Sequence, residues 1–122
     1  MARLYDIETN ESPFWIKVIR RETGQVVFDT SAGPILFYNQ FLQITTHRPT
    51  EYIYGFGETE HLSFKYDTDW HTQGMWARDN GVGPDSNLYG VQPYHIGMED
   101  DGKATGILFF NSNAQEVAVS PA

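Results

Sequence analysis

The chain of 122 residues contains no cysteine, no long apolar run and few basic residues. Without cysteine it has no disulfide, no thiolate metal ligand and no cysteine nucleophile. No apolar stretch approaches the roughly 20 residues that a membrane-spanning helix needs, so we expect no membrane segment. Eight Lys and Arg against 16 Asp and Glu leave a net charge of −8. We expect no nucleic-acid partner, because binding to phosphates requires a surplus of positive charge.

Aromatic residues, glycine and proline are by contrast well represented. Aromatics make up 15% of the chain, and there are 11 Gly and 6 Pro. Aromatic side chains favour strands, while Gly and Pro mark the turns between them. No segment shows a sustained helical period, and the length suits one domain. The composition therefore predicts an all-β fold.

Alternating apolar residues and turn residues divide the chain into short segments. Residues 1–12 are polar and are expected to form a loose lead-in, so the folded domain is expected to span 13–122. Residues 77–88 form the clearest loop, because they are rich in Gly, Asn and Asp. Gly55 and Gly57 lie inside a predicted strand and permit a bulge or a close backbone approach. The predicted strands are 14–19, 26–28, 35–38, 41–45, 52–58, 70–76, 89–98, 105–110 and 115–119.

Clusters of ionisable side chains are the first candidates for chemistry. The acidic and histidine residues close enough in sequence to bind a metal are Glu58, Glu60, His61 and His71. Their spacing matches no diagnostic metal motif, so polar surface residues are the simpler interpretation. Asp67 and Asp69 could serve as an acid and a base, but such pairs are more often solvated charges. From the residues alone, the chain is an acidic β-sandwich-like domain without a diagnostic catalytic motif.

Residues 52–61, YIYGFGETEH, carry a more specific pattern. They resemble the YxYGFGE-x-EH segment of glycoside hydrolase family 31, which includes maltase-like and lysosomal α-glucosidases. The resemblance covers about residues 13–120. Further stretches that agree in order are Phe41 to Thr46 before Arg48-Pro49, Trp70-His71-Thr72 before Arg78-Asp79, Asn87 to Gly90 before Pro93-Tyr94, and Phe110 to Ala114.

This resemblance implies a fold and a function. In the family an N-terminal β-sandwich, similar to galactose mutarotase, precedes a (β/α)8 barrel that carries the two aspartates of a retaining mechanism. No part of this sequence resembles the barrel motifs, and it ends before the last strands of the family's sandwich. We therefore expect an incomplete sandwich that is not catalytic by itself and needs no cofactor. The expected parent is an α-glucosidase that releases terminal α-linked glucose from oligosaccharides in an extracellular, luminal or lysosomal compartment.

The resemblance also supplies candidate substrate-binding residues. In the family a loop with an Arg-Asp pair reaches over the mouth of the barrel, which here corresponds to Arg78 and Asp79, followed by Asn80. A carboxylate suits this role because it accepts charge-assisted hydrogen bonds from two sugar hydroxyls. The alternatives for Asp79 are an Asx-turn or a salt bridge to Arg78. The sequence departs from the family directly after Asp79, and Gln73 stands where a Trp is usual. Glu58 is expected to be structural and to bond loop backbone.

The expected partners are the oligosaccharide substrate and the catalytic barrel of the same polypeptide. A second copy is a further expected partner, because an incomplete sandwich exposes a strand edge and apolar residues of the segment 107–110. The rival hypothesis is a stand-alone carbohydrate-binding or protein-interaction module derived from this domain. Whether a barrel follows Ala122 in the gene distinguishes the two.

Overall fold

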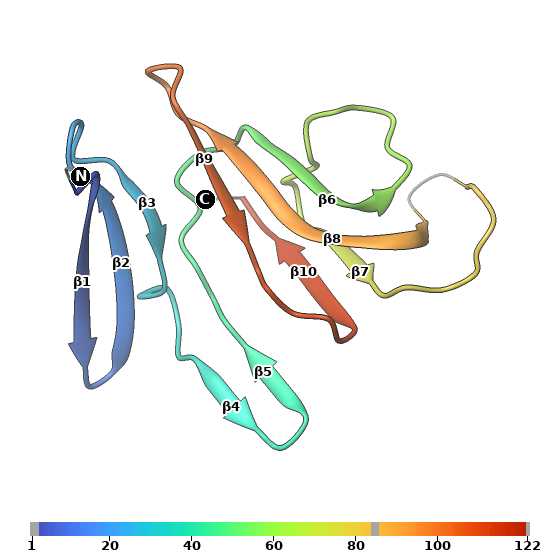
Figure 1. Cartoon of the computed structure of the whole chain (residues 1–122), viewed down its shortest axis with the longest axis horizontal. Helices are drawn as coiled ribbons and strands as arrows, with labels where there is room; N and C mark the ends of the chain where they lie inside the picture. The colour runs from blue at the N-terminus through green and yellow to red at the C-terminus, as the bar shows by residue number, and fades with distance from the viewer. Residues whose placement is uncertain (1–2, 84–85, 122) are drawn as a thin grey trace. The chain divides into compact units, whose positions relative to one another are not determined.

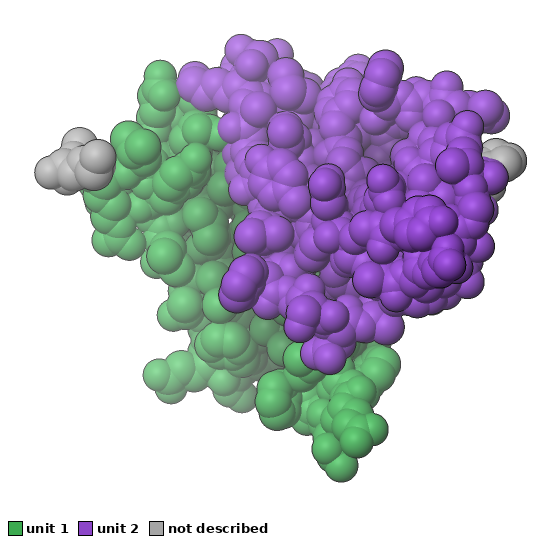
Figure 2. Space-filling view, turned by 45° about the vertical axis from the view of Figure 1, so that its right-hand side comes forward, with its two compact units in different colours: residues 1–49 green, residues 50–122 purple. Residues whose placement is uncertain are grey.

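The computed structural model describes residues 3–83 and 86–121, which form ten β-strands and no helix (Figure 1). The predicted all-β class is therefore confirmed. Nothing in the described residues forms a helix of the length and apolarity needed to cross a membrane. Contacts divide the chain into two compact units, Met1–Pro49 and Thr50–Ala122, which Figure 2 colours green and purple.

The first unit consists of an antiparallel three-stranded sheet and a hairpin. The sheet has the order β1-β2-β3, and β4 pairs with β5. The turn at Glu22 to Gln25 joins β2 to β3, as the sequence predicted, and the amide of Gly24 donates to Arg20 O at 2.8 Å. The strands are β1 (Tyr5–Glu11), β2 (Phe14–Arg20), β3 (Val26–Asp29), β4 (Leu36–Tyr38) and β5 (Phe41–Gln43).

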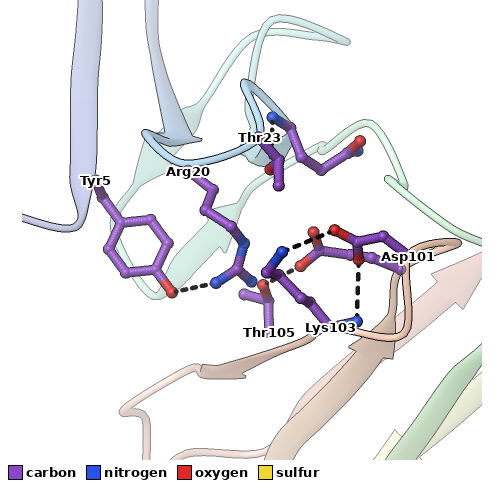
Figure 3. Close-up of polar contacts among 8 residues, drawn as sticks. Tyr5, Arg20, Thr23, Asp101, Lys103 and Thr105 are labelled. Atoms are coloured by element: carbon purple, nitrogen blue, oxygen red, sulfur yellow. Dashed lines mark hydrogen bonds and ion pairs between the residues drawn. The ribbon is translucent and has the colours of Figure 1, made fainter.

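Strand β1 corrects the prediction that residues 1–12 are a loose lead-in. It pairs with β2 along its whole length, from Tyr5 opposite Arg20 to Glu11 opposite Phe14. The Arg20 side chain also donates to the Tyr5 hydroxyl at 3.4 Å (Figure 3). The prediction failed because an edge strand gains most of its stability from backbone pairing. Such a strand needs little burial, and its polar composition is no obstacle.

The second unit contains two antiparallel sheets. One has the order β6-β8-β9, and in the other β10 pairs with β7. The turn between β8 and β9 is fixed by Asp101, whose Oδ1 accepts the Lys103 amide at 3.0 Å and whose Oδ2 lies 3.1 Å from its ammonium (Figure 3). The strands are β6 (Ile53–Thr59), β7 (His71–Met75), β8 (Asn87–Met98), β9 (Ala104–Leu108) and β10 (Gln115–Val119).

Both sheets of this unit contribute to one core. Its buried residues are Ile53, Phe56, Tyr66 and Met75, and Val91, Phe109, Val117 and Val119 pack against them. A core shared by two sheets is consistent with a β-sandwich. In the segment 107–110, Phe109 turns toward this core, while Leu108 and Phe110 are exposed. Only part of the predicted apolar segment is therefore accessible.

The glycines of β6 have the predicted effect. The pairing of β6 with β8 shifts register between Gly55 and Gly57 and again between Gly57 and Thr59. A Cβ on Gly55 would lie 2.5 Å from the carbonyl oxygen of Tyr94. The strand therefore contains both a bulge and a close backbone approach, which only glycine allows at this position.

Candidate functional site

The loop predicted at residues 77–88 connects β7 to β8 and is shorter than expected, because Asn87 and Leu88 belong to β8. Its two ends are joined by one side chain. Asn87 is the first residue of β8 and is only 6% exposed. Its Oδ1 accepts the backbone N–H of Trp76 at 3.0 Å, and its Nδ2 donates to the Trp76 carbonyl at 2.6 Å. The amide of Asn87 thus forms the two hydrogen bonds of a backbone pair and closes the base of the loop.

Asn80, predicted as a substrate-binding residue, folds back onto the same base. Its Nδ2 donates to the carbonyl oxygen of Asn87 at 2.9 Å. Asn80 is partly buried, whereas the preceding Arg78 and Asp79 are exposed. The third residue of the predicted set therefore holds the loop, and the first two present their side chains to solvent.

Arg78 and Asp79 each have a partner on a neighbouring strand end. The guanidinium of Arg78 lies 4.9 Å from the centroid of the Trp76 ring, a cation–π contact. The carboxylate of Asp79 accepts a hydrogen bond from the Tyr89 hydroxyl, which raises the pKa of Tyr89. A carboxylate held in this way keeps other lone pairs for further donors. The structure thus brings the predicted residues together and gives Arg78 and Asp79 separate partners.

Strand β6 forms hydrogen bonds with both strands that flank the loop. Gln73 is buried in β7. Its side-chain nitrogen Nε2 donates to the Phe56 carbonyl at 3.3 Å and to the Thr59 hydroxyl. Glu58 Oε2 accepts the backbone N–H of Gly90 at 2.9 Å. Glu58 bonds backbone as expected, but its partner lies in strand β8 and not in a loop. These contacts tie β6 to both strands that carry the loop.

The histidines near β6 belong to an aromatic cluster. Tyr66 lies between His61 and His71, with ring centroids 6.0 and 5.1 Å away. Burial raises the pKa of Tyr66, with a smaller contribution from the charge of Asp67. In the described parts of the chain, no three His, Asp or Glu side chains lie close enough to hold a metal ion. The carboxylate of Asp67 accepts the amide of Asp69 at 2.9 Å, a local turn contact.

Sequence reasoning missed Asn87 and Tyr89 as parts of the site. Both lie near the start of β8, the strand that follows the loop. The available signal was the NLYG stretch at 87–90, which carries an Asn directly after a Gly-rich loop. Asn at such a position commonly satisfies backbone groups of a neighbouring turn.

The chain is similar to long α-glucosidases over nearly its whole length. It is 50% identical over 119 residues to intestinal sucrase-isomaltase of Oryctolagus cuniculus, covering 98% of this chain and 6% of the relative. It is 43% identical to probable maltase-glucoamylase 2 of Homo sapiens, covering 98% of the chain and 5% of the relative. Lysosomal alpha-glucosidase of Mus musculus is 40% identical, with 97% of the chain and 12% of the relative covered.

These relatives share one family, although no protein-family model matches the chain. The chain spans only 5–12% of the length of these three relatives. Identity of 40–50% across almost every residue of the chain nevertheless establishes common descent with them. The chain is therefore homologous to a segment of these relatives, which are members of glycoside hydrolase family 31.

Proposed function

We propose that the chain is part of an N-terminal, non-catalytic domain of a maltase-like α-glucosidase, a β-sandwich of the galactose-mutarotase-like type that includes β1 (Tyr5–Glu11). The observation that carries this proposal is identity of 40–50% to α-glucosidases of which the chain spans a small part. In this proposal the domain packs on the catalytic barrel of the same polypeptide. The loop residues 77–83 of this domain shape the pocket for the oligosaccharide.

The geometry of the loop supports a role in substrate binding. Arg78 and Asp79 are exposed at its surface, while Asn80 and the buried Asn87 hold its base. A preorganised carboxylate binds sugar hydroxyls well because little entropy is lost when the sugar arrives. We propose that Asp79 accepts hydrogen bonds from the sugar on the leaving side of the cleaved bond, with Arg78 and Asn80 beside it.

The chain by itself is expected to show no hydrolysis of maltose, isomaltose or an aryl α-glucoside. A retaining glycosidase needs two carboxyl groups flanking the bond, and the motifs that carry them in the family are not present among these residues. Glucose release from purified chain is the measurement, with a full-length lysosomal α-glucosidase as the positive control. Turnover that co-purifies with the chain through several columns would contradict the proposal.

Asp79→Ala in the full-length polypeptide is expected to lower kcat/KM for maltose about 5- to 30-fold. Losing charge-assisted hydrogen bonds to the sugar costs about 1–2 kcal/mol. The matched control is Asp100→Ala, which removes an exposed carboxylate from the turn between β8 and β9. Thermal unfolding should be the same for both variants. Equal kcat/KM values in the two variants would remove Asp79 from the pocket.

A further inference from the structure

We propose that Asn87 is a positioning residue, which holds Asp79 in place for the substrate without touching the substrate. This inference rests on the proposed role of loop residues 77–83 and adds a residue that controls their geometry. Asn87 is buried, so it acts through the loop.

The first step of the argument is that Asn87 joins two different sheets. Strand β7 pairs with β10, and β8 pairs with β6 and β9, so no backbone ladder connects β7 to β8. The Asn87 side chain makes the connection with its hydrogen bonds to the backbone N–H and C=O of Trp76. A side-chain amide offers a donor and an acceptor side by side for such a pair, whereas an ionised carboxylate offers acceptors alone. This residue therefore holds the two ends of the loop, at Trp76 and Asn87, directly against each other.

The second step is that the start of β8 holds two consecutive loop residues. The Asn87 carbonyl accepts from the Asn80 side chain at 2.9 Å, and the Tyr89 hydroxyl donates to Asp79. Any shift of Asn87 relative to Trp76 would therefore move Asn80 and change the position of Asp79. A displacement of about 1 Å is sufficient to weaken an oriented hydrogen bond to a ligand.

The test is a double-mutant cycle between Asn87 and Asp79 in the full-length polypeptide. Asn87→Asp keeps the size of the side chain and the acceptor for Trp76 N–H. It places a carboxylate oxygen where Nδ2 now donates to the Trp76 and Leu88 carbonyls, at 2.6 and 3.3 Å. We expect this change to lower kcat/KM for maltose about as much as Asp79→Ala does. The double variant should lose no more than about a further twofold, because both changes remove the same interaction.

The control is Asn111→Asp, at an Asn that also bonds local backbone in the second unit. Its Nδ2 donates to Asn113 O at 3.3 Å, and its Oδ1 accepts the Asn113 amide at 3.2 Å. It should leave kcat/KM unchanged. If the effects of Asn87→Asp and Asp79→Ala multiply, Asn87 acts only through general stability and the inference is overturned. If Asp79→Ala alone leaves kcat/KM unchanged, the proposed role of the loop in substrate binding is wrong. The positioning role of Asn87 is then wrong as well, because Asp79 would not contact the substrate.

A second readout uses the present chain and needs no activity. Hydrogen exchange at the Trp76 amide and across residues 77–83 should become faster in Asn87→Asp than in Asn111→Asp, with the β6 amides unaffected. Unchanged hydrogen exchange in residues 77–83 would contradict the proposal that the Asn87 side chain holds the loop. If Asn87→Asp does not fold, Asn80→Ala serves in its place, because it removes the hydrogen bond to the Asn87 carbonyl from a partly exposed position. Asn80→Ala is expected to speed hydrogen exchange in the loop only. Its effect on kcat/KM should likewise not multiply with that of Asp79→Ala.

Discussion

Replacing Gly55 with alanine is expected to lower the free energy of unfolding by about 3 kcal/mol or more. Gly55 has a φ of +115°, in the region that side chains with a Cβ rarely adopt. An added Cβ would lie 2.5 Å from Tyr94 O and 3.0 Å from His95 Cα, both backbone atoms of the neighbouring strand. Neither atom can move without separating β6 from β8. The loss would be a large part of the roughly 5–15 kcal/mol that stabilises a typical domain.

Urea unfolding followed by circular dichroism measures this effect. The matched control is Gly81→Ala in the exposed loop, where an added Cβ would meet no atom within 4 Å. The free energy of unfolding of that control should lie within about 0.5 kcal/mol of the value for the unsubstituted chain. Equal midpoints for the two variants would show that β6 and β8 do not approach as closely as the structure indicates.

His95 is expected to make the second unit less stable as the pH falls from about 6.5 to about 4. Its ring stacks on Phe56 at 4.5 Å and on Phe109 at 6.0 Å, and its Nδ1 is buried without a hydrogen-bond partner among the residues that the structure describes. Burial lowers the pKa of His95 to about 4. The unfolded chain, whose His has a pKa near 6.5, therefore binds the proton first. The stabilisation from neutral His95 is complete above about pH 6.5 and is lost progressively toward pH 4.

The loss from His95 is expected to reach about 2–3 kcal/mol at pH 4, after allowance for partial exposure of the ring. Urea midpoints at pH 7, 5.5 and 4.5 measure it. His95→Phe, which keeps a ring between Phe56 and Phe109 but cannot be protonated, should remove most of the slope. His47→Gln, at an exposed position, should leave the slope unchanged. A slope that survives in His95→Phe would assign the pH dependence to other groups.

Local pattern was sufficient to predict most strands of this chain. Alternating apolar residues and the turn at Glu22 to Gln25 placed β2 and β3, and Gly55 with Gly57 indicated the bulge in β6. Strand β1 was missed because its stability comes from pairing with β2, and a pairing partner leaves little trace in local hydrophobicity. The division into two units was also outside what the composition indicated.

The sequence by itself determined the all-β class, the loop around Asp79 and, through its resemblance, the family. The composition and the order of the motifs are local properties, and both can be read along one chain. Only the tertiary structure decided three other features: the hydrogen bonds of Asn87 to Trp76, the burial of His95 and the partner of Glu58. Each joins residues from different strands, and Trp76 and Asn87 are separated by a loop whose length alone does not specify where its ends meet. Such contacts arise when two sheets pack, and no periodicity in the sequence encodes them.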